Sequence, residues 1–262
     1  MTTLSQDVAA ARPPVLETCG LSKSYGGLAA VNGVDLRVYP GEAHAVIGPN
    51  GAGKTSLINL VSGQTRPSAG AIRFAGRDIA GLPAHKVARL GIGRSFQKTN
   101  IYGRLSCFEN CWLAAQTRLP HAMRFFRPAL GRTDIRRHAE EALETAGLAH
   151  RARIAAAAMS YGEQRQLEIA MVLATGPAML VLDEPMAGMG REESETVVRL
   201  LLALRGRYPL LLVEHDMDAV FAIADTLTVM VNGTVIASGA VRDVRNSRAV
   251  QDAYLGDGEE KY

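Results

Sequence analysis

The sequence has no hydrophobic run long enough to cross a lipid bilayer. A membrane-spanning helix needs about 18 or more consecutive apolar residues, whereas the richest runs here, Leu200 to Leu204 and Leu210 to Val213, are separated by arginines and a proline. The first residues also lack the basic segment followed by an apolar segment that marks a secretory signal. We therefore expect a cytoplasmic protein that does not span the membrane, with a short disordered lead over residues 1–14.

Cysteine is scarce, and nucleic-acid-binding motifs are missing. The three cysteines, Cys19, Cys107 and Cys111, form no CxxC pair, which favours a reduced, intracellular chain. Cys107 and Cys111 are four residues apart, so we expect them to pack on one helix face. The net charge is +3, but no RGG, zinc-finger or recognition-helix pattern accompanies the arginines, so we expect no nucleic-acid partner.

What is present is the composition of a globular α/β protein. Of the 262 residues, 47% are hydrophobic and 21% are charged, which excludes disorder for most of the chain. Alternating apolar residues over 34–38, an apolar run over 43–48 and a short run over 71–74 predict strands, with an antiparallel sheet in the N-terminal part. The pattern becomes helical over about 107–159, which predicts an inserted helical subdomain, placed at 98–160.

The later part alternates buried strands with helices. Strands are expected at 179–182 and 210–213, and helices at 192–204 and 218–224, which is typical of a parallel sheet with crossover helices. Asn232-Gly233 between two apolar runs predicts a hairpin with a type I′ turn. The segment 241–255 is expected to be helical.

A phosphate-binding loop is the first motif that carries chemistry. Residues 48–55 fit G-x-x-x-x-G-K-[ST], in which glycines free backbone N–H groups to converge on phosphate oxygens and the lysine adds a positive charge. Thr55 places a hydroxyl where Mg²⁺ would sit. The expected ATP-binding residues of the loop are Gly48, Pro49, Asn50, Gly51, Ala52, Gly53, Lys54, Thr55 and Ser56.

Two acidic residues end the buried strand at 179–182. A carboxylate such as Asp183 is costly in that position unless it binds a cation or accepts hydrogen bonds, so Mg²⁺ is its expected partner. Glu184 follows and points elsewhere because side chains alternate along a strand. We predict that Glu184 is the general base that activates water for attack on the γ-phosphate.

A third motif lies between these two. Ser160, Tyr161, Gly162 and Glu163 open an expected helix, so the serine hydroxyl and the free amides predict an anion site. The three motifs in this order, over Leu21 to Gly256, resemble the ATP-binding cassette of an ABC transporter. The resemblance implies an ABC ATPase fold, which is a P-loop NTPase core with a parallel sheet, an N-terminal antiparallel β subdomain and an inserted helical subdomain over one domain, 15–262.

The resemblance also implies roles for single residues. Gln97 is similar to the family's Q-loop glutamine, which ligates the metal with Thr55 and Asp183. His215 resembles the switch histidine that bonds the γ-phosphate, and Tyr25 resembles the aromatic residue that stacks on adenine. The segment Ser160–Glu163 is similar to the signature, which reads the ATP held by a second ATPase subunit, identical or not.

Two departures and several alternatives stand beside this interpretation. Glu163 stands where the family usually has Gln, and Gly190 where an acid or Asn is usual, which puts a D-loop carboxylate role in doubt.

The motifs around Tyr25 and His215 and the ending Ala253–Gly256 look like the ATPases of branched-chain amino acid importers. Such an ATPase acts at the cytoplasmic face of the inner membrane with ATP and Mg²⁺, two permease subunits and, indirectly, a solute-binding protein. The alternatives are a lipopolysaccharide-exporter ATPase, a soluble non-transport cassette and a P-loop kinase.

Overall fold

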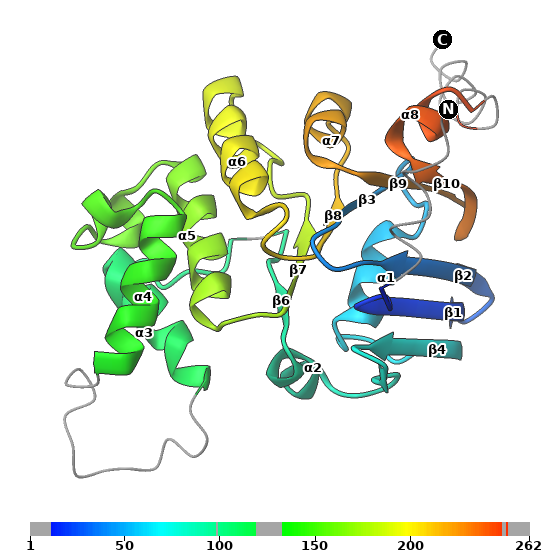
Figure 1. Ribbon diagram of the computed structural model, residues 1–262, viewed down its shortest axis with the longest axis horizontal. Helices are drawn as coiled ribbons and strands as arrows, with labels where there is room; N and C mark the ends of the chain where they lie inside the picture. Colours follow the sequence, from blue (N-terminus) through cyan, green and yellow to red (C-terminus); the bar gives the residue numbers. More distant parts are fainter. Residues whose placement is uncertain (1–11, 98, 119–132, 248–249, 251–262) are drawn as a thin grey trace. The chain divides into compact units, whose positions relative to one another are not determined.

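The computed structural model describes residues 12–97, 99–118, 133–247 and 250 (Figure 1). Contacts divide the chain into two compact units: unit 1 comprises Met1–Val87 and Leu204–Tyr262, and unit 2 comprises Ala88–Ala203. Within the described ranges, no helix is long and apolar enough to cross a membrane.

Unit 1 contains an antiparallel sheet in the order β2-β1-β4-β5. The strands are β1 (Leu16–Tyr25), β2 (Leu28–Val38), β4 (Ala69–Phe74) and β5 (Arg77–Asp78). Val34, Leu36 and Val38 of β2 are buried while the residues between them are exposed, as the alternation predicts. The expected N-terminal antiparallel sheet is therefore confirmed.

Four further strands of unit 1 are built around a central buried strand. They are β3 (Ala43–Ile47), β8 (Leu210–Val213), β9 (Thr226–Val231) and β10 (Thr234–Ala240). Strand β3 pairs in parallel with β8 and β9, and β10 pairs antiparallel with β9. Because Val46 lies opposite Val213, the segments that follow β3 and β8 leave the sheet at the same end.

The helices of unit 1 are short. They are α1 (Lys54–Val61), α2 (Ala84–Leu90), α7 (Met217–Ile223) and α8 (Val241–Arg245), with α2 beginning in unit 1. The prediction of a helical segment over 241–255 is confirmed in α8 and wrong at Asn246 and Ser247, which are not helical, while 251–255 lie outside the described residues. The Asn232-Gly233 turn is confirmed, since both residues have positive φ, 48° and 78°.

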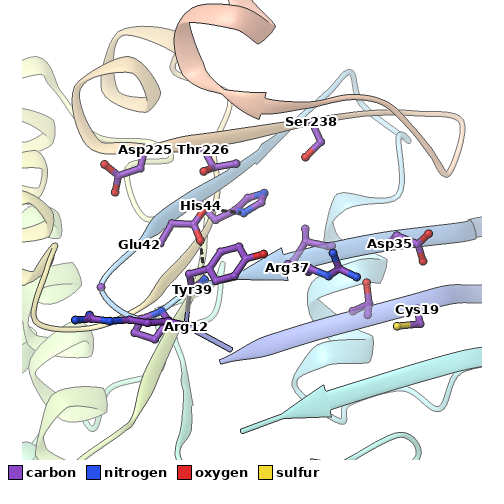
Figure 2. A pocket seen from close by; sticks show the side chains of 14 residues that line it. Arg12, Cys19, Asp35, Arg37, Tyr39, Glu42, His44, Asp225, Thr226 and Ser238 are labelled. Atoms are coloured by element: carbon purple, nitrogen blue, oxygen red, sulfur yellow. Dashed lines mark hydrogen bonds and ion pairs between the residues drawn. The ribbon is translucent and has the colours of Figure 1, made fainter. Parts of the chain in front are cut away.

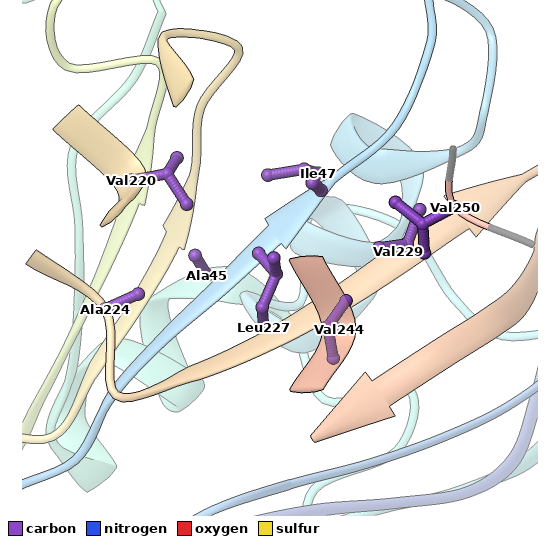
Figure 3. Close-up of a cluster of buried hydrophobic side chains, with 8 residues drawn as sticks. All are labelled: Ala45, Ile47, Val220, Ala224, Leu227, Val229, Val244 and Val250. Carbon is purple, nitrogen blue, oxygen red and sulfur yellow. The ribbon is translucent and has the colours of Figure 1, made fainter. Parts of the chain in front are cut away.

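One hydrophobic cluster joins the strands and helices of unit 1 (Figure 3). Ala45 and Ile47 of β3 and Leu227 and Val229 of β9 supply its centre. The cluster consists of Ala45, Ile47, Val220, Ala224, Leu227, Val229, Val244 and Val250. Since β3 and β9 carry apolar side chains here, the strand that leads into the glycine loop is fixed by packing.

Unit 2 combines a parallel strand pair with helices. Its elements are β6 (Ile92–Arg94), α3 (Cys107–Ala115), η2 (Gln116–Arg118), α4 (Thr133–Thr145), η4 (Ala149–Arg151), η5 (Ala156–Ala158), α5 (Tyr161–Ala174), β7 (Met179–Asp183) and α6 (Arg191–Leu204). The predicted helical character over 107–159 is confirmed in α3 and α4. Residues 119–132, and residues 1–11 of the lead expected over 1–14, lie outside the described residues.

The two cysteines expected on one helix face, and two arginines of α4, have ordinary structural roles in unit 2. Cys107 and Cys111 are both buried on α3, so their expected packing on one helix face is confirmed. Arg136 forms an ion pair with Glu140 at 2.9 Å. Arg137 forms an ion pair of the same i,i+4 spacing with Glu141. Exposed pairs at this spacing contribute only a few tenths of a kcal/mol.

A pocket of about 1000 Å³ in unit 1 is lined in part by a connected group of polar side chains (Figure 2). Glu42 Oε2 accepts a 2.6 Å hydrogen bond from the Tyr39 amide, and its Oε1 lies 3.4 Å from Nδ1 of the buried His44. His44 Nε2 is 2.8 Å from the Thr228 hydroxyl, which is 2.7 Å from the Ser238 hydroxyl. This chain of side chains ties the start of β3 to β9 and β10.

Glu42 gives a testable contribution to stability. Burial alone would raise the pKa of the Glu42 carboxyl, but contacts with His44, Thr226 and the Tyr39 amide lower it below its ordinary value. A carboxyl with a lowered pKa in the folded state stabilises the fold above its unfolded pKa, and this contribution disappears as pH falls through the folded pKa. We expect Glu42→Gln to reduce the free energy of unfolding by about 1–2 kcal/mol at pH 7.

Denaturant unfolding at pH 7 and at about pH 3.5 tests this expectation. The difference between Glu42→Gln and the unchanged chain should shrink at the lower pH, because the contribution of the ionised carboxyl to stability is lost progressively as pH falls. Glu144→Gln, which removes a carboxylate from the exposed face of α4, serves as the control and should change little at either pH. An equal loss of stability at both values would contradict the assignment.

Candidate functional site

The glycine loop after β3 has the backbone geometry of a phosphate cradle. Gly48, Gly51 and Gly53 all have positive φ, at 151°, 80° and 98°. A Cβ on Gly48 would collide with the Met230 carbonyl oxygen, and one on Gly53 with that of Ala30. Only glycine fits these positions, so the spacing of the motif follows from the closeness of neighbouring backbone.

Helix α1 begins directly after this loop. Its N-cap Gly53 has no side chain to bond the first amides, and its first turn holds no acidic residue, so the positive end of the helix is not neutralised locally. Lys54 is buried, and its Nζ donates to the carbonyls of Gly48 at 2.6 Å and Pro49 at 2.9 Å. Thr55 is exposed, whereas Ser56 is half-buried.

His215 and Tyr25 are the other predicted site residues of unit 1. His215 follows β8 and therefore leaves the sheet at the same end as the glycine loop. Its side chain is 64% exposed, and its backbone amide donates to the buried carboxylate of Glu214 at 3.0 Å, which fixes the turn. Tyr25 ends β1 and is 47% exposed, and the Lys23 ammonium lies 5.0 Å from the ring centroid.

Gln97, Asp183 and Glu184 gather at one end of the strand pair in unit 2. Strands β6 and β7 run parallel, with Arg94 opposite Val181, so the segments after them lie side by side. Gln97 Nε2 donates to Glu184 Oε2 at 3.0 Å. Glu184 has φ +46°, a conformation that is uncommon for any residue except glycine and typical of strained functional positions.

Asp183 is the buried carboxylate of this group. Burial raises the pKa of the Asp183 carboxyl above its ordinary value, and the neighbouring Glu184 adds to this, although Arg94 opposes it. Arg94 Nη2 lies 3.2 Å from Asp183 Oδ2, and both side chains are almost fully buried. A carboxylate in such a place needs a compensating cation, and Arg94 supplies one within unit 2.

A clamp that sequence reasoning missed holds the same strand ends. Arg165 on α5 is fully buried and donates to the carbonyls of Asp183 at 3.0 Å and Glu184 at 2.9 Å. It also donates to the carbonyl of Phe96 and, at 2.5 Å, to the carboxylate of Glu168, which in turn accepts from the Phe96 amide. The clamp therefore fixes the backbone on both sides of the Gln97–Glu184 contact.

The sequence did carry one signal for this pair. Arg165 and Glu168 are three residues apart on an expected helix, a spacing at which opposite charges meet. Nothing in the spacing indicates that the pair is buried or that its partners are backbone carbonyls of distant segments. Those facts depend on the packing of α5 against the ends of β6 and β7.

The head of α5 is a capped helix N-terminus, so the helix predicted to begin at this segment is confirmed. Ser160 is the N-cap, its hydroxyl accepts from the Glu163 amide at 3.3 Å, and the Glu163 carboxylate accepts from the Ser160 amide at 3.0 Å. Glu163 also accepts from Arg151 Nε at 2.7 Å, so the acid that replaces the usual Gln is neutralised by a neighbour. Tyr161 is exposed and Gly162 is buried.

The site residues thus form two groups. Tyr25, the glycine loop and His215 belong to unit 1, whereas Gln97, Asp183, Glu184 and the segment Ser160–Glu163 belong to unit 2. The predicted Mg²⁺ ligands, Thr55 in unit 1 and Asp183 and Gln97 in unit 2, carry a hydroxyl, a carboxylate and an amide oxygen, which are of the oxygen type that this ion prefers. No cluster of three His, Cys, Asp or Glu side chains suited to a metal occurs among the described residues.

This fold and these motifs define a nucleotide-binding ATPase, and comparison with known proteins identifies its class. Residues 31–187 match the ABC transporter family, so the chain belongs to that family and is one of its ATPases. Residues 234–260 match the family described as branched-chain amino acid ATP-binding cassette transporter. The ending Ala253–Gly256 falls within this match but lies outside the described residues.

Particular relatives extend over nearly the whole chain. The chain is 39% identical to the high-affinity branched-chain amino acid transport ATP-binding protein BraF of Pseudomonas aeruginosa, over 93% of this chain and 98% of BraF. It is 38% identical to LivG of Escherichia coli, which has the same description, at the same coverage. A solved ATP-binding cassette of an ABC transporter in its ADP conformation matches with a TM-score of 0.83 and 28% identity, over 93% of this chain and 99% of that one.

Proposed function

We propose that this chain is the ATPase subunit that powers the uptake of branched-chain amino acids, or of closely related apolar amino acids, across the plasma membrane. The observation that carries the proposal is the 38–39% identity to BraF and LivG over 93% of the chain. The match of residues 234–260 to a branched-chain amino acid family adds to it. Two such subunits, identical or paired with a related ATPase, would act at the cytoplasmic face with two permeases and a solute-binding protein.

In this proposal unit 1 binds the nucleotide. The amides of the glycine loop and the ammonium of Lys54 hold the phosphates, and Tyr25 stacks on the adenine through its exposed ring. His215 donates a hydrogen bond to the γ-phosphate. Its exposed side chain and its fixed backbone suit a group that must meet a ligand without moving the strand behind it.

Unit 2 supplies the hydrolytic groups. Glu184 accepts the proton of the attacking water, and the donor from Gln97 keeps its carboxylate oriented. Thr55, Gln97 and Asp183 would hold Mg²⁺, which when bound neutralises charge on the phosphates. The Arg165 clamp holds the backbone of Asp183 and Glu184 and so supports the unusual φ of the base.

The signature segment links the two subunits. Ser160 and the amides at the head of α5 bind the γ-phosphate of the ATP that the partner subunit holds, because a helix N-terminus attracts an anion. Closure of the pair on two ATP molecules then drives the permeases. Each subunit is therefore incomplete alone.

Uptake of labelled leucine, isoleucine and valine tests the proposal in cells. We expect deletion of the gene, in a strain without a substitute ATPase, to reduce uptake of at least one of the three by about tenfold or more. The unchanged gene and Glu192→Gln should restore it, whereas Glu184→Gln should not. Undiminished uptake of all three amino acids would contradict the proposed transported solute. Isolation of the chain without any membrane permease would contradict its role in a transporter.

A further inference from the structure

A carboxylate from a neighbouring helix lies on the head of α5. Glu193, in the first turn of α6, accepts a 3.1 Å hydrogen bond from the Gly162 amide through Oε1. The Ser160 hydroxyl bonds to the same carboxylate. Both donors belong to the segment Ser160–Glu163, and all three residues belong to unit 2.

The fit of Glu193 over Gly162 is close. A Cβ added to Gly162 would lie 2.8 Å from Glu193 Cβ and 2.9 Å from its Cγ, both nearer than real side chains approach. Glycine at this position therefore allows the glutamate stem to lie against the α5 backbone. The carboxylate reaches the amide only because no side chain intervenes.

The contact favours the ionised form of Glu193. The Gly162 amide first, then the Ser160 hydroxyl, lower the pKa of the Glu193 carboxyl below its ordinary value. No arginine, lysine or histidine of the described chain forms an ion pair with Glu193, in contrast to Glu163, which Arg151 neutralises. The negative charge of Glu193 is thus held by neutral donors, chiefly those at the head of α5, with a smaller contribution from the Gly190 backbone.

The neighbouring glutamate shows that this contact is not a general property of the first turn of α6. Glu192 is exposed, and its carboxylate makes no hydrogen bond or ion pair with any residue that the structure describes. Glu192 and Glu193 both lie where an acid stabilises α6 through its dipole. Only Glu193 reaches the amide of Gly162 and the hydroxyl of Ser160.

We propose that Glu193 is an internal substitute for the γ-phosphate, which occupies the signature segment in the resting subunit and must leave before the ATP of the partner subunit can bind there. This inference rests on the proposed function, in which Ser160 and the amides of α5 receive that phosphate. A carboxylate and a phosphate cannot share these donors, because both are anions and would repel each other at contact distance. Glu193 thereby weakens closure of the ATP-bound pair.

The test is ATP-driven dimer formation by the full chain, measured by sedimentation or light scattering over a range of ATP and protein concentrations. All variants carry Glu184→Gln, so that ATP persists. We expect Glu193→Ala to lower the dissociation constant of the ATP-bound dimer by about tenfold or more, since a charged competitor for two hydrogen bonds is gone. Glu193→Gln should give a smaller gain, and the matched control Glu192→Gln should change the constant less than about twofold.

A second measurement separates release of the competitor from damage to the fold. Thermal unfolding of each variant without nucleotide reports whether α6 is intact. An unchanged or weaker dimer in both Glu193 variants, with the melting temperature kept in Glu193→Gln, would overturn the inference and show that Glu193 only supports the segment.

Failure of the proposed function would look different. In that case the Glu184→Gln protein would form no ATP-dependent dimer at all, and adding Ser160→Arg would change nothing. That result would contradict the shared site and, with it, the competition by Glu193. A dimer that forms with ATP and is abolished by Ser160→Arg keeps the proposed function, whatever the Glu193 variants show.

Discussion

Replacing Glu184 by glutamine should lower ATP hydrolysis by at least about 100-fold while ATP binding is retained. Glutamine has the size of glutamate and can still bond to Gln97, but it cannot accept the proton of the attacking water. The Arg165 clamp bonds to the carbonyl of residue 184 and not to its side chain, so the backbone should remain in place. ATP-bound dimers should therefore accumulate.

Phosphate release at saturating ATP, together with light scattering, measures both effects. Glu192→Gln is the matched control, because it removes the same charge from an exposed position of the same unit. A turnover number of Glu184→Gln close to that of the unchanged chain would contradict the assignment of Glu184 as the general base. Loss of nucleotide binding in the same variant would instead indicate a structural role.

Replacing Lys54 by alanine should weaken ATP binding by about 10- to 100-fold, because charge-assisted hydrogen bonds to phosphate contribute about 1.5–3 kcal/mol. The Lys54 ammonium is buried against the carbonyls of Gly48 and Pro49, directly over the loop that is expected to hold the phosphates. Truncation also removes these two bonds, so the loop itself should become less ordered.

Calorimetric titration with ATP and Mg²⁺ gives the affinity. Lys86→Ala, which removes a lysine from the exposed face of α2, is the control for net charge and should bind as the unchanged chain does. If Lys54→Ala bound ATP with full affinity, the glycine loop would not be the nucleotide site. Comparing the melting temperatures of both variants without ATP shows whether the fold is kept.

The elements that the sequence predicted well are those with a local cause. Strand β2 alternates because one face is buried, the Asn232-Gly233 turn needs two residues that accept positive φ, and the glycines of the loop stand where a Cβ would strike a carbonyl. The predicted helical segment 241–255 is interrupted, also from a local cause. Its apolar spacing continues past Arg245, but the polar Asn246-Ser247 pair ends α8.

The sequence by itself determined the class of protein, since the spacing of glycine, lysine and threonine in the loop and the acidic pair after an apolar strand are chemical requirements of phosphate and metal binding. Only the tertiary structure showed what holds these groups. Arg165 reaches carbonyls of two segments far from it in sequence, and Glu193 reaches the head of α5 across 31 residues. Such contacts depend on how α5 packs against strand ends and against α6, and no local pattern encodes that packing.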